Sequence, residues 1–195
     1  SIPLFWYSAD EQDADAQRWL AHLIACFRLG LPRLSDAPLA LLRERHADEA
    51  RRSLQQVLDA LLNALHETLS APSLLVIDDA HLITAAAESG ALLERLIEFA
   101  PPALHLVLAT RYPLPWAGLA RWRARGDVLE INRAQLAFTA EEIATLFRET
   151  YGLACSADEI SALADKTEGW PIALQMVWQG LRNGVAGDAA TLLAQ

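Results

Sequence analysis

The chain has 195 residues, a formal net charge of −9 and a hydrophobic content of 53%. Such a chain forms one or two globular domains, and its negative charge argues against direct contact with DNA or RNA, which requires a basic patch. No apolar run is as long as a membrane span, and no signal peptide opens the chain. The two cysteines form neither a disulfide framework nor a zinc pattern, so we expect a cytoplasmic protein without membrane contact.

The first part of the chain shows one strand pattern followed by two helix patterns. Residues 2–8 form a strand candidate, and residues 13–27 follow as an amphipathic helix with apolar side chains at helical spacing. A second, longer helix is expected over residues 47–69. Between the helices we expect a loop, because the helical pattern is broken by Gly30, Pro32 and Pro38.

An apolar strand that ends in two carboxylates follows the long helix. Residues 74–77 are wholly apolar, and such a run is typical of a strand buried on both faces in a parallel sheet. The run stops at Asp78 and Asp79. Parallel strands deliver their carboxyl ends to the crevice where ligands bind, so these two acids are candidates for a binding site.

The strand and helix patterns continue to alternate after the acid pair. A helix is expected over residues 86–99, a second buried strand over residues 104–111 and a short third strand over residues 128–131. This alternation predicts an α/β fold of three layers, in which a parallel sheet lies between two layers of helices.

The last third of the chain reads as helices alone. Capping boxes begin at Thr139 and at Ser156, each with an acidic residue three positions later. The expected helices cover residues 139–151, 156–167 and 170–183. The predicted organisation is an α/β core over residues 1–137, a helical subdomain over residues 138–185, and a linker or the start of a next element over residues 186–195.

Two interpretations of the acid pair are open. An apolar strand that ends in Asp is the Walker B pattern of P-loop nucleotide hydrolases, in which Asp78 would bind Mg²⁺ through water and Asp79 would help to position the attacking water. In the structural interpretation, the acids cap the following helix or are solvated at the strand end.

Two further motifs also have a functional and a structural interpretation. Thr110 and Arg111 end the next strand, and an Arg there can sense a γ-phosphate or form a salt bridge with one of the acids. Gly169, Trp170 and Pro171 read, on local physics, as a corner between two helices. His81 has no partner at metal-binding spacing and is expected to be structural.

The sequence contains no Gly-x-x-x-x-Gly-Lys-Ser/Thr loop, so the phosphate cradle of a P-loop site and its lysine are missing. That loop usually precedes the acid-tipped strand. Because the chain opens within a strand pattern, we expect that the loop was cut off rather than lost.

Taken in order, several segments resemble the ATPase module of the MalT-like, large ATP-binding LuxR-type transcription regulators, which are STAND P-loop NTPases. The resemblance covers nearly the whole chain. It is carried by residues 5–11, 15–20, 75–82 (the Walker B segment), 106–111, 119–126, 136–142 and 167–175.

The resemblance implies a nucleotide-binding α/β domain with a helical subdomain. It implies that Asp78 serves Mg²⁺, that Arg111 beside Thr110 serves the γ-phosphate of ATP, and that the corner at residues 169–171 lies on the adenine side. It also implies a switch between ADP-bound resting and ATP-bound assembling states. The implied partners are the protein's own winged-helix, sensor and DNA-binding domains, and the resemblance leaves room for self-association.

Two other hypotheses compete with the ATP-dependent switch. One is a degenerate interaction module that binds no nucleotide, and the other is a different ATPase, such as an AAA-type loader. We expect ATPase activity only of a longer protein and an inactive segment when it stands alone. A phosphate-binding loop upstream of Ser1 would favour the switch over the interaction module.

Overall fold

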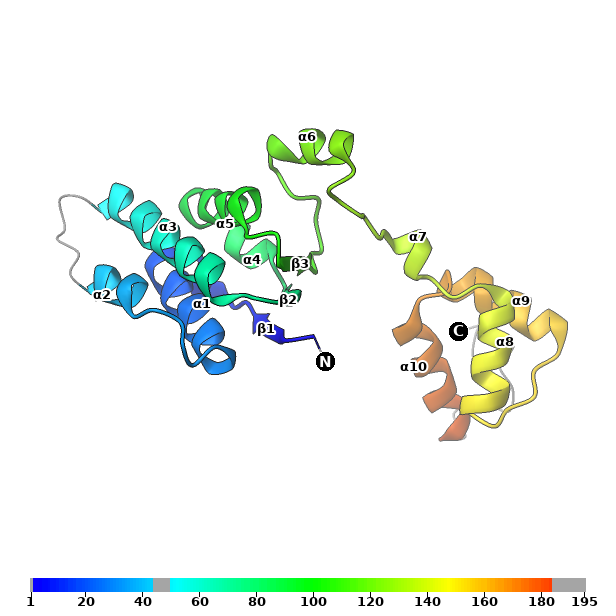
Figure 1. Ribbon diagram of the computed structural model, residues 1–195. Helices are drawn as coiled ribbons and strands as arrows, with labels where there is room; N and C mark the ends of the chain where they lie inside the picture. The colour runs from blue at the N-terminus through cyan, green and yellow to red at the C-terminus, as the bar shows by residue number, and fades with distance from the viewer. Residues whose placement is uncertain (1, 44–49, 184–195) are drawn as a thin grey trace. The chain divides into compact units, whose positions relative to one another are not determined.

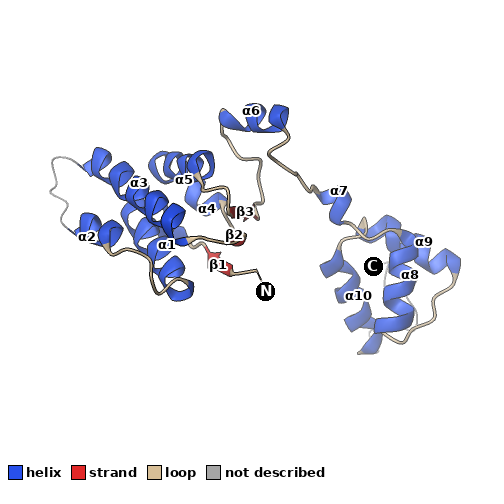
Figure 2. Ribbon diagram, in the orientation of Figure 1, coloured by secondary structure: helices blue, strands red, loops and turns tan. Residues whose placement is uncertain are grey.

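The computed structural model describes residues 2–43 and 50–183, and the chain divides into two compact units, Ser1–Asp127 and Val128–Gln195. The first unit contains both strands and helices, and the described part of the second unit is helical, as Figure 2 shows. The expected mixture of α and β structure is therefore confirmed. The boundary that we predict after residue 137, between the α/β core and the helical subdomain, stays a prediction.

A three-stranded parallel sheet forms the centre of the first unit, in the order β1 (Leu4–Ser8), β2 (Ser73–Asp78), β3 (Leu104–Leu108). The register pairs Ser8 with Asp78 and Ile77 with Leu108. All three carboxyl ends therefore reach the same edge of the sheet. The three predicted strands of this sheet are confirmed, but the third ends at Leu108, so Thr110 and Arg111 follow the strand instead of ending it.

Helices cover one face of this sheet, and Figure 1 shows α1, α3 and α5 on the same side of the strands. The predicted helices at residues 13–27 and 86–99 are confirmed, whereas residues 47–49 of the predicted long helix lie outside the described residues. The helices of the first unit, with one 3-10 turn, are η1 (Glu11–Ala14), α1 (Ala16–Gly30), α2 (Ala37–Arg43), α3 (Ala50–Thr68), α4 (His81–Thr84), α5 (Ala87–Phe99) and α6 (Gly118–Arg125).

The core of the first unit lies between the sheet and these helices. Phe5 of β1 and Phe27 of α1 are buried, with ring centroids 4.9 Å apart. Each fully buried large apolar side chain stabilises the fold by roughly 1.5–3 kcal/mol relative to an exposed one. The apolar stripe of α1 has the three- and four-residue spacing of one helix face, and its buried members are Trp19, Leu20, Leu23, Ile24 and Phe27.

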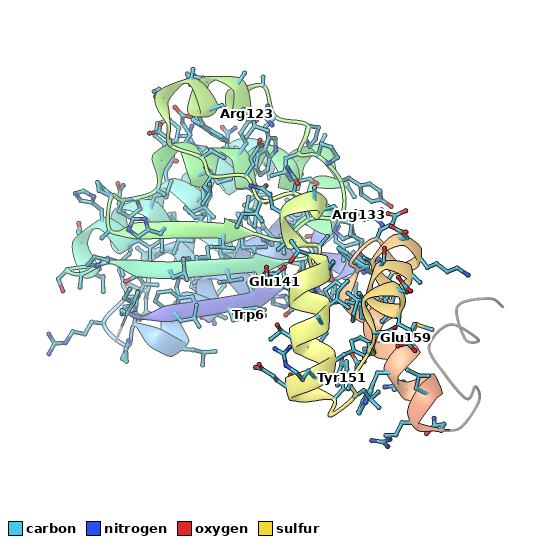
Figure 3. All side chains as sticks on the ribbon, turned by 90° about the vertical axis from the view of Figure 1, so that its right-hand side faces the viewer. Trp6, Arg123, Arg133, Glu141, Tyr151 and Glu159 are labelled. Atoms are coloured by element: carbon cyan, nitrogen blue, oxygen red, sulfur yellow. The ribbon has the colours of Figure 1, made fainter. Side chains whose placement is uncertain are left out.

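The opposite face of the sheet is mostly apolar, and it is uncovered along the two outer strands, whereas Val76 of the central strand is buried. Leu4 and Trp6 are each 58% exposed, and Val107 is 47% exposed. Trp6 pairs with Val76, which pairs with Val107, so these side chains form a row across all three strands. Figure 3 shows the sheet with Trp6 labelled on β1. Within the described residues of the first unit, 2–43 and 50–127, the second helical layer of the predicted three-layer arrangement is not seen.

Two local predictions were wrong. Residues 128–131 form no strand, because they pair with no neighbouring strand and expose Leu129 and Ile131. The predicted loop around Pro38 contains α2, because proline is tolerated in the first turn of a helix, where its missing N–H breaks no hydrogen bond. Pro38 and Leu42, four residues apart, are both buried.

The second unit is a small helical bundle with its own core. Its elements are α7 (Arg133–Leu136), α8 (Ala140–Thr145), the π-helical turn η3 (Leu146–Thr150), α9 (Ala157–Thr167) and α10 (Pro171–Arg182). The three predicted helices are confirmed, and both capping boxes form. The predicted linker over residues 186–195 lies outside the described residues. The buried core consists of Ile143, Phe147, Ile160, Leu163, Leu174 and Val177.

None of the helices in the described parts of the chain is long and apolar enough to cross a membrane.

Candidate functional site

The candidate site lies where the three parallel strands end. The backbone hydrogen bonds continue past the strands, because Ala9 N donates to Asp78 O over 3.0 Å and Ala80 N donates to Ala109 O over 2.9 Å. These bonds tie the three segments that follow the strands to one another. The polar residues that begin those segments are therefore held along one edge, as the sequence predicted.

Asp78 and Asp79 occupy the turn after β2. The Asp78 side chain is half-buried, and its Oδ1 accepts a hydrogen bond from Asp79 N at 3.0 Å. Asp79 has a φ of 52°, a left-handed conformation that Asp and Asn tolerate better than most residues. Neither acid caps the helix that follows, because α4 has no side-chain hydrogen bond at its N-cap, Ala80. The helix-capping interpretation of the acids is therefore wrong.

Arg111 reaches the acid pair from the end of β3. Its Nε lies 3.6 Å from Asp79 Oδ1, and its side chain is 72% exposed. The predicted salt bridge between Arg111 and one of the acids is thus present, with Asp79 as the partner. An ion pair this exposed contributes roughly 0–1 kcal/mol to stability, so little free energy opposes its exchange for another partner.

His81 contacts the same carboxylate from the start of α4. Its Nδ1 lies 3.8 Å from Asp79 Oδ1 and is buried without a hydrogen-bond partner. Its ring meets the Tyr112 ring edge to face, with centroids 5.7 Å apart. Sequence reasoning treated His81 as structural and missed its contact with Asp79. Its position three residues after Asp78, at the start of a helix, was the available signal.

Thr110 shapes the turn after β3. Its hydroxyl donates to Tyr112 O over 2.8 Å and accepts from Tyr112 N over 3.3 Å. Both interactions are internal to the turn, which carries Arg111 between Thr110 and Tyr112. Thr110 therefore supports the loop that presents Arg111.

The remaining predicted site residues, Gly169, Trp170 and Pro171, belong to the second unit. Glu168 and Gly169 have φ values of 49° and 68°, and Pro171 opens α10. The backbone of Phe138 passes against this corner, with Phe138 N donating to Gly169 O over 2.8 Å. The predicted corner between two helices is confirmed.

Arg133 of α7 secures this corner and was not predicted. Its Nη2 lies 2.5 Å from Glu168 Oε2, and its guanidinium lies 5.6 Å from the centre of the Trp170 ring. Arg133 and the start of α9 are visible in Figure 3. The available signal was the capping box Asn132–Gln135, which places Arg133 at the first position of a helix.

The described residues contain no cluster of three or more His, Cys, Asp or Glu side chains that could hold a metal ion by themselves. A shallow hollow of about 700 Å³ opens beside α1 instead of at the strand ends. None of the predicted site residues lines it; the lining residues are Glu11, Gln12, Asp15, Gln17, Arg18, Ala21 and Leu42.

The fold and the candidate site define a class: an α/β unit whose parallel sheet ends in an acid pair and an arginine, joined to a small helical unit.

No protein-family profile matches the chain. Curated relatives do match it. The chain is 34% identical over 98% of its length to the HTH-type transcriptional regulator MalT of Serratia proteamaculans, and 33% identical to those of Yersinia pestis and Yersinia pseudotuberculosis.

The chain is therefore MalT-like over nearly its whole length. It spans about a fifth, 21%, of the length of these relatives.

Proposed function

We propose that this chain is part of the ATP-binding switch of a bacterial LuxR-family transcription regulator. The observation that carries the proposal is the pairing of Asp79 with Arg111 at the strand ends, 3.6 Å apart, with Asp78 beside them. The relatives, which are named as transcriptional regulators, support the same proposal. In the longer protein the partners would be its own winged-helix, sensor and DNA-binding domains, in the cytoplasm.

The acids suit Mg²⁺ by their chemistry. Mg²⁺ prefers oxygen ligands and is commonly held by one or two carboxylates together with water and the phosphates of a nucleotide. Asp78 is half-buried at the edge of the sheet and is the residue we assign to Mg²⁺. Bound Mg²⁺ would supply neutralisation of the phosphate charge. The phosphate-binding loop itself has no counterpart among the 195 residues.

Arg111 would change partners when a nucleotide binds. In the structure it faces the Asp79 carboxylate, and the exposed pair contributes little free energy. A γ-phosphate carries more negative charge than one carboxylate and accepts two parallel hydrogen bonds from a guanidinium. Arg111 would therefore leave Asp79 for the phosphate, which frees Asp79 to orient the attacking water.

The corner at Gly169, Trp170 and Pro171 is the part of the second unit that we assign to the adenine side. Its support is the combination of a rigid backbone at Gly169 with an indole ring that is 38% exposed. An exposed indole offers a flat apolar surface of the kind on which bases stack.

The uncovered sheet face supports the layering of a P-loop NTPase. Parallel sheets occur almost only with both faces covered, yet Leu4, Trp6 and Val107 are exposed here. We therefore expect a longer chain to supply a helical layer on this face.

This layering gives a prediction for Trp6→Thr. In the 195-residue chain the substitution should change the free energy of unfolding by no more than about 1 kcal/mol, because the side chain is exposed. In a longer chain that covers the face, it should cost about 3–5 kcal/mol. Urea denaturation of both chains measures the difference.

The neighbouring Phe5 provides the matched control for that measurement. It is buried on the other face of the same strand, so Phe5→Ala should be costly in both chains. Equal costs of Trp6→Thr in the two chains would contradict the second layer.

A nucleotide titration tests the proposed function. The chain is extended upstream to include a phosphate-binding loop, and its melting temperature is measured with ATP or ADP and Mg²⁺. A ligand that binds the native state raises the melting temperature. A folded, extended protein whose melting temperature is unchanged at millimolar nucleotide would overturn the proposal.

The alternative function is a degenerate module that binds a protein partner instead of a nucleotide. Two observations favour it: the sequence lacks a phosphate-binding loop, and an apolar sheet face is exposed. If no phosphate-binding loop is encoded upstream, this alternative replaces the switch.

A further inference from the structure

A buried carboxylate lies in the turn that follows β1, next to the candidate site. Asp13 is 1% exposed, and its Oδ2 accepts a hydrogen bond from Asp10 N at 3.0 Å. Asp10 is the second residue after the end of β1. The bond therefore closes the turn η1 directly beside the edge of the sheet.

The cost of burying this carboxylate is only partly offset. Oδ1 of Asp13 lies 3.6 Å from His22 Nδ1 and 4.0 Å from Arg18 Nε, and it has no hydrogen-bond partner. The buried hydroxyl of Tyr7 lies close to the same carboxylate, Asp13. Burial raises the pKa of the Tyr7 phenol, and the nearby Asp13 carboxylate raises it further. A buried charge with incomplete pairing is weak as a source of stability, so a positional role is the better explanation.

The turn closed by Asp13 is attached to the segments on either side of the acid pair. Ala9, directly before the turn, donates to Asp78 O. At its other end, Ala14 O accepts a 2.7 Å hydrogen bond from the buried hydroxyl of Ser89 on α5. The body of the turn packs against α4, which begins two residues after Asp79. Through Ala9 the turn is linked to Asp78, and the turn itself contacts α4, which follows Asp79, and α5.

We propose that Asp13 is a positioning residue, which fixes the turn Glu11–Ala14 against α4 and α5 and thereby holds Asp78 and Asp79 in place. The geometry of this turn carries the inference, and only the ligand of the acid pair rests on the proposed function. Asp13 itself touches no reacting group. It acts through the backbone of Ala9 and through the packing of α4.

Amide hydrogen exchange of the 195-residue chain without nucleotide tests this role. Asp13→Ala removes the acceptor for Asp10 N, and we expect exchange at the amides of Ala9, Asp79 and Ala80 to accelerate by about tenfold. Asp13→Asn retains an oxygen at the same position and should restore most of the protection. Rescue by asparagine would show that the hydrogen bond to Asp10, and not the charge, positions the turn.

Asp15→Ala is the matched control. Asp15 is in the same segment and caps α1 by accepting from Arg18 N over 2.8 Å, so its loss costs about 1 kcal/mol without opening the turn. In the Asp15→Ala variant, the amides of α1 should exchange faster, whereas the amides of Asp79 and Ala80 should stay protected. If Asp13→Ala and Asp15→Ala accelerate exchange at these amides equally, after correction for global stability, the positioning role is overturned.

This outcome is independent of nucleotide binding. Loss of protection at the acid pair in Asp13→Ala would stand even if the titration of the extended chain showed no binding. A titration that succeeds would not rescue the inference if the exchange pattern failed.

Discussion

Gly169→Ala is expected to destabilise the second unit by about 3–5 kcal/mol, which is enough to unfold a marginally stable helical bundle. Gly169 has a φ of 68°, where an L side chain is strained. A Cβ at this position would lie 2.3 Å from Phe138 O and 2.9 Å from Phe138 N. Both contacts involve backbone atoms, which cannot rotate away as a side chain would. The decrease in the free energy of unfolding is measured by urea denaturation monitored by circular dichroism.

Gly152→Ala is the matched control in the same unit. Gly152 has a φ of 70°, nearly that of Gly169, but a Cβ there would meet no atom within 4 Å. The Gly152→Ala substitution should therefore lower the free energy of unfolding only by the backbone strain, about 1 kcal/mol. The difference between the two variants isolates the contact with Phe138. Similar losses in both would show that Phe138 can shift to accept a methyl group.

Asp78→Asn is expected to abolish Mg²⁺-dependent ATP hydrolysis in a chain extended through the phosphate-binding loop, with a fall in kcat of at least about 100-fold. The amide keeps an oxygen that can accept from Asp79 N, so the turn should stay folded. It lacks the negative charge that holds Mg²⁺. The measurement is phosphate release with and without Mg²⁺.

Asp59→Asn serves as the control for this substitution. Asp59 is a partly exposed carboxylate of α3 in the same unit, and it pairs with Arg95 on α5 through two hydrogen bonds. Loss of the Asp59 carboxylate should leave the rate of ATP hydrolysis unchanged. Unchanged turnover in Asp78→Asn would remove the role assigned to Asp78.

The strands and the acid pair were predictable because local sequence determines them. A run of apolar residues that ends in Asp78 needs no distant information to be recognised as a buried strand with a polar tip. The capping boxes at Thr139 and Ser156 are likewise local, since the N-cap and its partner are three residues apart. These features gave the mixed α/β character, the order of most elements and the edge that carries the candidate site.

The rest depends on contacts between distant residues. Residues 128–131 have strand-like composition but no neighbouring strand to pair with, and pairing is not encoded locally. The pairing of Arg111 with Asp79 joins residues thirty-two positions apart, so no local pattern encodes it. The need for glycine at position 169 comes from Phe138, thirty-one residues earlier in the chain. Single-sequence patterns contain none of this information.

The order of the strands has a practical consequence for handling the protein. Within the described residues, β1 and β3 are edge strands, each with one row of backbone N–H and C=O groups that no neighbouring strand covers. Exposed edges beside apolar side chains such as Trp6 and Val107 allow molecules to add to one another strand by strand. A preparation limited to these 195 residues should therefore aggregate with increasing concentration, and a longer chain that pairs with these edges and covers the apolar face should remain dispersed.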